Sequence, residues 1–367
     1  MKPLGAVLFM LVALTLSAAT KPVIYCTDLF HPHVDPDDHF DLATLFALPE
    51  LDVKAIVLDQ GNRQLERPGS IPLKQMFSLA GHEVPYAIGL SEKLASPADD
   101  GRGQPAGFQH GVGLMLKTLR EASQPVTIIT AGSVRDLCAA WNREPELLRE
   151  KVGRLYLNIG NAAADSSEYN VDLDPHAYVG ILRSDLPIYL CLCMPMGRQS
   201  ADSVYSTWWR FRQADVVGSV PEPLQRFFIY ALQRCAPDEL DPLKALESDL
   251  RPWRRLVWDM DRNMWCTASF LHAAGRKIYM TGQTWTAPLT RPPNGTSEAL
   301  FTFFPARVEV DEAGKTKLLP GAANSNVQLL KVVSPDEYAP ALRDCLRGLL
   351  QSGFPARAPA GGRSSAG

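Results

Sequence analysis

Short apolar segments alternate with amphipathic segments through the first half of the chain, and this alternation constrains the fold more than any other feature. The apolar segments predict strands at residues 23–26, 53–58, 84–88, 126–130, 155–159 and 188–193. The amphipathic segments predict helices at residues 38–48, 72–80, 112–122, 134–141 and 175–182. Strands that alternate with helices pair in parallel, so we expect an α/β fold with a Rossmann-like core, in which helices flank a mostly parallel central sheet. Ligands bind such sheets at the carboxyl ends of the strands.

The second half of the chain has a different pattern. Residues 199–250 are rich in aromatic side chains and helix formers, and we expect them to be helical. Residues 299–310 and 315–319 flank the turn sequence DEAG, which predicts a C-terminal β-hairpin. A strand at 327–333 and a closing helix at 335–350 follow. Repeats and linkers are missing from the middle of the sequence, so residues 20–351 are expected to form one domain.

The two ends of the chain differ from this domain. The sequence begins MKPLGAVLFMLVALTLSAAT, with an early lysine, an apolar run and small residues at its end. This pattern predicts a secretory signal peptide at residues 1–19 and a secreted or periplasmic protein with no stable membrane span. An uncleaved anchor or a buried N-terminal helix are the alternatives. Residues 352–367 contain few core formers and are expected to be a disordered tail.

Composition excludes several classes of protein. Lysine and arginine number 37 against 40 aspartates and glutamates, so a net charge of −3 gives no argument for binding nucleic acid or an acidic membrane. The sequence holds seven cysteines and no CxxC pair, which excludes a zinc ribbon or a thioredoxin-like motif. Most cysteines lie in apolar segments and are expected to be small buried hydrophobes.

A dense group of carboxylates follows the first predicted strand. It comprises Asp28, Asp35, Asp37, Asp38 and Asp41, directly before and within an apolar helix. Carboxylates that converge at the end of a strand repel one another unless a cation lies between them, and Ca²⁺ and Mg²⁺ prefer such oxygen ligands. The same residues could instead cap the helix, where negative charge is favourable. Both interpretations remain open on these residues alone.

Three histidines in the same segment leave a transition metal open, as in a phosphoesterase that uses aspartate and histidine. These are His31, His33 and His39. His31 and His33 flank Pro32, however, and are expected to be exposed loop residues. The later Asn-His and His-x-His motifs that such enzymes need are missing from the sequence.

The acidic segment resembles the signature of the inosine-uridine preferring nucleoside hydrolases. In that family a first strand ends in an aspartate, and an Asp-Asp pair opens the next helix; Asp28 and the pair Asp37-Asp38 are similar to these. Pro49-Glu50 lies at the usual offset, and Gly61-Asn62 ends the second strand as Gly-Asn does in the family. The turn LFHPHVDP is longer than the family's, so either Asp28 or Asp35 could fill the first acidic position.

The resemblance continues along most of the chain. QHGVGL at 109–114 is similar to the family's His-Gly-x-x-Gly-Leu stretch, and TAGSVRD follows a strand as Thr-Gly-Pro-Leu-Thr-Asn does. LYLNIGN stands where a Met-Gly-Gly turn is usual. Glu168, Asn170 and Asp174-Pro175 are similar to the family's Glu-Phe-Asn and Asp-Pro. The order and spacing of these weak motifs together make the resemblance specific.

The resemblance implies a nucleoside hydrolase-like fold and a calcium-dependent hydrolase of N-glycosidic bonds, with a nucleoside or another small ribosyl compound as substrate. By resemblance, Asp28 and Asp38, with Asp35 as the alternative for Asp28, and the Ala131 carbonyl would bind Ca²⁺. The catalytic residues would be Asp28, which itself or through a neighbour accepts a proton from water, and Asp37, which binds a ribose hydroxyl. The remaining ribose contacts would be Asn62, Glu168 and Asn170. From their sequence context alone, these three could equally be a turn residue, a surface charge and a helix cap.

The C-terminal part departs from the family. The family has a further aspartate that binds calcium and opens a helix, and Met264 stands about where it is expected. Asp259 or Asp261 could reach in from one turn earlier. His272 and His110 are candidates for the acid that protonates the leaving group, and Trp258 and Trp265 could stack on a base or simply pack. The departure leaves open a catalytically weak or inactive nucleoside- or sugar-binding protein of the same fold, and a homo-oligomer is possible.

Overall fold

The computed structural model describes residues 20–163, 167–197, 200–233, 240–249, 254, 258–320 and 325–354. The predicted signal peptide at residues 1–19 lies outside the described residues, as does most of the predicted tail. The last helix, α14 (Pro335–Gly353), continues slightly past the expected domain end at residue 351. In the described part of the chain, none of the helices has the length and apolar character that crossing a membrane requires.

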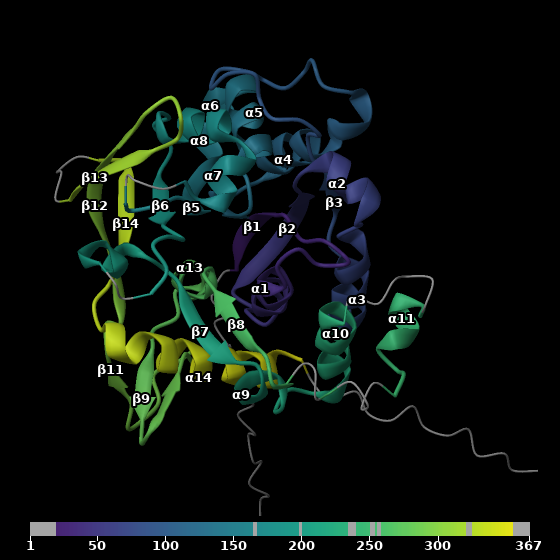
Figure 1. Cartoon of the computed structure of the whole chain (residues 1–367), viewed down its shortest axis with the longest axis vertical. Coiled ribbons are helices and arrows are strands. Elements are labelled where there is room, and N and C mark those ends of the chain that lie inside the picture. The colour runs from purple at the N-terminus through teal and green to yellow at the C-terminus, as the bar shows by residue number, and fades with distance from the viewer. Residues whose placement is uncertain are drawn as a thin grey trace, which may run out of the picture.

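A sheet of nine strands runs through the centre of the molecule in the order β13-β12-β14-β6-β5-β4-β1-β2-β3 (Figure 1). Seven neighbouring strands pair in parallel: β1 (Lys21–Thr27), β2 (Leu51–Leu58), β3 (Tyr86–Ile88), β4 (Val126–Ala131), β5 (Val152–Asn158), β6 (Ile188–Cys191) and β14 (Val327–Val332). The predicted parallel sheet is confirmed. The predicted C-terminal hairpin is confirmed as β12 (Phe301–Val310) and β13 (Thr316–Pro320), which add to one edge in antiparallel fashion.

Helices cover both faces of this sheet, as predicted. The helices of the first half are α1 (Asp37–Phe46), α2 (Gly61–Glu66), α3 (Ser70–Ala80), η1 (Ala106–Phe108), α4 (His110–Glu121), α5 (Arg135–Arg143), α6 (Pro145–Lys151), α7 (Tyr169–Leu173) and α8 (Pro175–Leu182). Side chains alternate along β1 between two cores. Val23 and Tyr25 join the core under α1, α13 (Thr267–Ala274) and α14, whereas Ile24 and Cys26 join the core under α4, α5 and α8.

The expectation that residues 199–250 are helical is wrong in part. The segment contains η2 (Ala201–Tyr205), α9 (Ala214–Val217), α10 (Glu222–Leu232) and α11 (Pro242–Ala245), but also strand β7 (Trp209–Arg212). Within β7, Trp209 and Phe211 are buried and the two arginines are exposed, which is the alternation of a strand. β7 pairs with β8 (Asp261–Met264), and β9 (Tyr279–Thr281), β10 (Thr284–Thr286) and β11 (Thr296–Ser297) form a third small sheet.

The cysteines behave as expected where the structure describes them. Cys26, Cys138, Cys191, Cys193, Cys266 and Cys345 are buried and free. Cys235 lies outside the described residues.

Candidate active site

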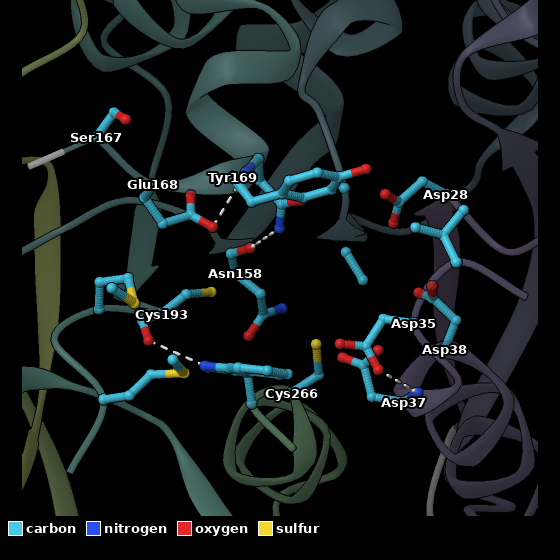
Figure 2. Close-up of a pocket in the computed structure, with 17 residues that line it drawn as sticks. Asp28, Asp35, Asp37, Asp38, Asn158, Ser167, Glu168, Tyr169, Cys193 and Cys266 are labelled. Atoms are coloured by element: carbon cyan, nitrogen blue, oxygen red, sulfur yellow. Dashed lines mark hydrogen bonds between the residues drawn. The ribbon is translucent and has the colours of Figure 1, made fainter. Parts of the chain in front are cut away.

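A cavity of about 310 Å³ opens at the carboxyl ends of β1, β4 and β5. These ends lie side by side because Thr27 pairs with Ala131, and Ala131 pairs with Asn158. Figure 2 shows Asp28, Asp35, Asp37 and Asp38 on one side of the cavity, with Glu168 and Cys193 across from them. The other lining residues are Val34, Ala131, Gly132, Asn158, Ser167, Tyr169, Asn170, Met194, Met196, Trp265 and Cys266. The position is the one that the parallel sheet predicts.

Asp28 is the first residue after β1, and it is enclosed by two neighbouring loops. Its backbone N–H donates to the Ala131 carbonyl at 3.0 Å, and the Gln60 side chain donates from Nε2 to its Oδ2 at 3.3 Å. Gly132 has a φ of +131°, and a Cβ there would lie 3.0 Å from Asp28 Oδ1. Burial first, and then the charge of Asp59, raise the pKa of Asp28 to about 8.

Asp37 and Asp38 occupy the first turn of α1, where the helix dipole favours negative charge. Asp38 is 7% exposed and its Oδ1 accepts a hydrogen bond from Thr27 Oγ1 at 3.1 Å. Burial raises the pKa of both carboxyls well above the usual range; Asp28 adds to this for Asp38, and Asp35 adds to it for Asp37. The residue before the helix is Pro36, and its side chain makes no capping hydrogen bond.

Asp35 differs from its neighbours because the protein supplies a cation for it. Arg262 donates from Nη1 to Asp35 Oδ1 at 3.2 Å, and the same guanidinium donates from Nε to Gln213 at 3.2 Å. The Arg262 side chain is buried, whereas that of Asp35 is half exposed. Asp28 directly follows the first strand and, among the described residues, makes no ion pair with a lysine or arginine.

Glu168 and Asn170 form the wall opposite the aspartates. The Glu168 carboxylate accepts from the backbone N–H groups of Gly160 at 2.8 Å, Asn170 at 3.0 Å and Val171 at 3.2 Å, and so caps α7. It is 6% exposed, so it is no surface charge, and burial raises its pKa to about 7. The Asn170 side chain donates to the backbone carbonyl of Asn158 at 3.2 Å.

Asn158 is a lining residue that the sequence patterns alone do not single out. Its Nδ2 donates to the Thr130 carbonyl at 2.9 Å, which fixes the orientation of the amide. Its Oδ1 is buried and has no hydrogen-bond partner among the described residues. Figure 2 places the side chain between the aspartates and the opposite wall. The position at the end of the fifth strand was the available signal, since such positions face the ligand in parallel sheets.

This geometry agrees with what the chain resembles. The model of the inosine-uridine preferring nucleoside hydrolase family matches residues 30–316. The chain belongs to this family. The expected family and the expected fold class are both confirmed.

Individual relatives of the nucleoside hydrolase family match part of the chain. Pyrimidine-specific ribonucleoside hydrolase RihA of Salmonella paratyphi B is 32% identical over 190 residues, which are 46% of this chain and 59% of that protein. RihA of Salmonella typhi gives the same values. The chain therefore spans 59% of the length of these curated relatives.

Solved structures of nucleoside hydrolases share the fold over most of the chain. A plant nucleoside hydrolase, the PpNRh1 enzyme, superposes with a TM-score of 0.53 at 17% identity and covers 90% of this chain and 99% of its own. A purine-preferring ribonucleoside hydrolase from Gardnerella vaginalis gives a TM-score of 0.50 at 17% identity, with the same coverage. At this identity the likeness concerns the fold.

Met264 is not among the described residues that line the cavity, and its match to the family's C-terminal aspartate stays a prediction. Met264 is fully buried in β8 opposite Trp209, and the residue that opens α13 is Cys266, which lines the cavity. The two nearby aspartates do not reach in. Asp259 pairs with Arg212 at 2.7 Å and Asp261 pairs with Arg210 at 2.8 Å, both on the surface. The chain is extended in strand β8 here, so Asp259 and Asp261 do not lie one helical turn before Met264, contrary to the expectation from the sequence.

Trp265 and Cys266 line another part of the cavity, where they contribute an aromatic ring and a thiol instead of carboxylates. The Cys266 thiol lies against the Asp41 carboxylate, whose oxygens have no nitrogen or oxygen donor among the described residues. Burial raises the pKa of the Cys266 thiol well above its usual range and that of Asp41 to about 7. Trp265 donates from Nε1 to the Cys193 carbonyl at 2.9 Å, so its ring lines the cavity as an apolar surface. Trp258 is not among the described lining residues.

Asn62 lies outside the cavity. It belongs to α2, and its side chain donates to Glu92 at the surface. Gln60, two residues earlier, contacts Asp28 instead. The predicted ribose contact of Asn62 is therefore not brought together with Glu168 and Asn170 in the described structure.

The histidines do not line the cavity either. His31 and His33 are buried, so the expectation of exposed loop residues is wrong; His31 stacks on Tyr230 and His33 lies edge-on to His39. His110 is exposed. His272 bonds to Tyr156 at 2.7 Å, and burial lowers its pKa to about 4. None of these five is among the described residues that line the cavity, which removes the support for a phosphoesterase and for either proposed leaving-group acid.

The aspartates of the cavity suit a calcium ion by the chemistry of their donor atoms and by their position at the end of β1. Within the described part of the chain, no three histidine, cysteine, aspartate or glutamate side chains are grouped closely enough to hold a metal ion. The expected convergence of Asp28, Asp37 and Asp38 on one point is therefore not seen. The donors on this wall are nevertheless all oxygens, as Ca²⁺ prefers. Burial and neighbouring carboxylates raise the pKa values of these aspartates, and a nearby cation lowers such pKa values.

Proposed function

We propose that this protein is an exported, calcium-dependent hydrolase of N-glycosidic bonds in ribonucleosides or related ribosyl compounds. The observation that carries the proposal is one cavity in which a wall of aspartates faces Glu168, Asn158 and Asn170, at the carboxyl edge of a nucleoside hydrolase fold. Polar acceptors of this kind suit a sugar with several hydroxyl donors. RihA, whose name records pyrimidine ribonucleosides, supports uridine as a first substrate to test. Export rests on the apolar sequence at residues 1–19.

The proposed calcium ligands are Asp28, Asp38 and the carbonyl of Ala131, with Asp35 as the nearest further carboxylate. When bound, calcium lowers the pKa of a coordinated water and of the carboxyls beside it, and it orients sugar hydroxyls. The Ala131 carbonyl accepts a hydrogen bond from the Asp28 backbone N–H at 3.0 Å, and a carbonyl has a second lone pair. Asp35 is shared with Arg262, which makes it the weaker candidate.

In the proposed reaction, different residues activate the water, bind the ribose and hold the binding residues in place. Asp28 accepts the proton of the attacking water as the water oxygen bonds to C1′ of the ribose. The C1′–N bond breaks with its electron pair left on the nitrogen of the base, which takes up a proton from solvent. Asp37 accepts a hydrogen bond from a ribose hydroxyl and keeps the sugar in line with the water. Asn170 and the free Oδ1 of Asn158 bind the remaining hydroxyls, and Glu168 holds their loop through three backbone N–H groups.

Cys266 weakens this calcium site in our proposal. In this proposal Cys266, the residue before α13, stands where the family has its C-terminal carboxylate, and burial raises the pKa of its thiol well above the usual range. A protonated thiol is a poor ligand for a hard cation. The same observation favours a second candidate function, a nucleoside- or sugar-binding protein of this fold with little or no hydrolysis.

Ribose release separates the two candidates. The purified protein is incubated with uridine and inosine, with calcium or with EDTA, beside Asp28→Asn and the surface control Asp52→Asn. We expect release with calcium, loss with EDTA, loss in Asp28→Asn and full activity in Asp52→Asn. Nucleoside binding without release from any nucleoside would overturn the hydrolase and leave the binding protein.

A further inference from the structure

The turn after β2 contains a strained residue. Gln60 has φ 59° and ψ 61°, and among the described residues it is the one non-glycine with a positive φ. Side chains with a Cβ avoid this left-handed region, and glutamine is not among the residues that tolerate it best. Strain of this kind persists where surrounding contacts enforce it, and it clusters at functional sites.

Backbone contacts lock the turn in this conformation. The Gln60 N–H donates to Asp59 Oδ1 at 2.7 Å. The same Asp59 carboxylate accepts from the backbone N–H of Ser133 at 2.8 Å and from its hydroxyl at 2.9 Å. Asp59 therefore joins the loop after β2 to the loop after β4, and these two loops enclose Asp28 between Gln60 and Gly132.

The side chain of Gln60 uses both ends of its amide. Nε2 donates to Asp28 Oδ2 at 3.3 Å, and Oε1 accepts from Arg63 Nη1 at 3.0 Å. The bond from Arg63 fixes which end of the amide faces Asp28, because a guanidinium can only donate. Gln60 is 6% exposed, so this arrangement is held inside the protein rather than in solvent.

Arg63 extends the contact to the rim of the cavity. Its Nη1 also donates to the Tyr169 hydroxyl at 3.2 Å, and its guanidinium lies 4.9 Å from the centre of the Phe30 ring. Tyr169 lines the cavity from α7. A continuous set of contacts thus runs from Tyr169 through Arg63 and Gln60 to Asp28.

We propose that Gln60 is a positioning residue that holds the Asp28 carboxylate in its working orientation, with Arg63 as its anchor. The inference rests on the proposed function, in which Asp28 binds calcium and accepts a proton. One Asp28 oxygen is engaged by the Gln60 amide and the other lies against Gly132, so the plane of the carboxylate is fixed. A turn that served structure alone would favour glycine at Gln60, because glycine adopts this φ without strain.

The variant Gln60→Gly distinguishes a residue that positions Asp28 from a residue that only shapes the turn. It keeps the backbone conformation and removes the amide, so we expect kcat to fall about tenfold to a hundredfold, as small misplacements of a catalytic group do. KM should change by less than about twofold, because the substrate contacts remain. The urea midpoint should stay the same or rise, since glycine relieves the strain. Unchanged kcat with a lower urea midpoint would show a structural turn and overturn the proposal.

Variants of Arg63 test whether this residue anchors the Gln60 amide. Arg63→Met leaves the amide in place without its anchor and should lower kcat less than Gln60→Gly does. The double variant should lose little more than Gln60→Gly alone, because Arg63 orients Asp28 mainly through the Gln60 amide. Additive losses would overturn the role of Arg63 as the anchor. Gln351→Ala, on the exposed side of α14, is the matched control and should retain wild-type kcat.

Calcium binding gives a readout independent of turnover. Titration calorimetry with CaCl₂ should show weaker binding by Gln60→Gly than by the wild type, by about tenfold or more, as loss of an oriented supporting contact does to other metal sites. If the wild type binds calcium but hydrolyses no nucleoside, the proposed function fails and this affinity difference alone decides the role of Gln60. Equal affinities together with equal kcat would overturn the positioning role.

Discussion

Two groups of buried carboxylates lie close to each other in this protein and differ in what balances their charge. The first, the arginine-centred group, comprises Asp59, Asp136 and Asp174 around Arg135. Arg135 donates from Nε to Asp174 at 2.9 Å, and both side chains are almost fully buried. Its remaining donors reach the carbonyls of Leu90 at 3.1 Å and Leu173 at 3.0 Å. Folding thus supplies a cation to Asp174, although burial still raises the pKa of Asp59 and raises that of Asp136 to about 7.

The second, the pocket group, comprises Asp28, Asp37, Asp38 and Asp41. Burial and the neighbouring carboxylates raise the pKa of Asp28, Asp37 and Asp38, and no lysine or arginine is among the described residues that line the cavity. Arg262 reaches only Asp35 by an ion pair. A buried carboxylate without a cation destabilises the fold unless it is protonated. The contrast teaches that the protein itself supplies a cation to the first group, whereas the second is balanced by protonation or, in the proposed function, by a bound calcium ion.

Removing Arg135 should have the largest effect on stability. Arg135→Met leaves Asp174 buried without its partner, and breaking such a buried pair costs about 3–5 kcal/mol. Urea unfolding measures this loss. Arg183→Met, which removes an exposed ion pair with Glu312, should leave the urea midpoint unchanged. Similar midpoints for both variants would mean that Arg135 does not complete its group.

The same substitution should act with opposite signs in the two groups. Asp38→Asn removes a repelled charge, so the calcium-free protein should become more stable, while ribose release should fall at least about a hundredfold. Asp174→Asn should instead lower stability, because it leaves Arg135 without its carboxylate. Thermal denaturation and a ribose assay on both variants make the comparison. A loss of stability in Asp38→Asn would break it.

Stability should depend on pH through the pocket group. The folded-state pKa of Asp28 is about 8, above the value of 3.8 expected in the unfolded chain, so the folded protein binds this proton more tightly. Its contribution to stability is fully present below about pH 4 and is lost as pH rises toward 8. Over this range the wild type without calcium should lose at least about 2 kcal/mol more than Asp28→Asn does. Parallel curves from urea unfolding at several pH values would argue against an unbalanced Asp28.

Cys266→Asp adds a carboxylate to the wall of the cavity that the proposal leaves without one. The new carboxylate should tighten calcium binding about tenfold and should destabilise the calcium-free protein, because it lies beside Asp41. Calorimetry and thermal denaturation with and without calcium measure the two effects. Cys266→Ser is the control and should change neither by much. Weaker calcium binding in Cys266→Asp would place the site away from α13.

Patterns that repeat along the chain predicted most of the fold. Alternating apolar and amphipathic segments gave the parallel sheet and its helices, and the density of aspartates after β1 located the cavity. Strand β7 was missed because its aromatic residues also suit a helix, and only the burial of Trp209 and Phe211 against exposed arginines separates the two. The export signal at residues 1–19 stays a prediction.

Contacts between distant segments could not be predicted from the sequence. Arg262 lies 227 positions from Asp35, yet their ion pair decides which aspartates of the segment remain without a cation. Met264 was assigned the family's aspartate position by offset, but β8 carries the chain on to Cys266. The free oxygen of Asn158 and the contact of Gln60 with Asp28 also depend on how neighbouring strand ends meet.

A calcium titration of the metal-free protein tests the central claim most directly. Isothermal titration calorimetry at neutral pH should detect a single calcium ion per chain, with protons released as the pocket carboxylates ionise. Binding should disappear in Asp38→Asn and persist in the surface control Asp52→Asn. Absence of calcium binding to the folded wild type, or equal binding by Asp38→Asn, would contradict the claim that the pocket group is completed from outside.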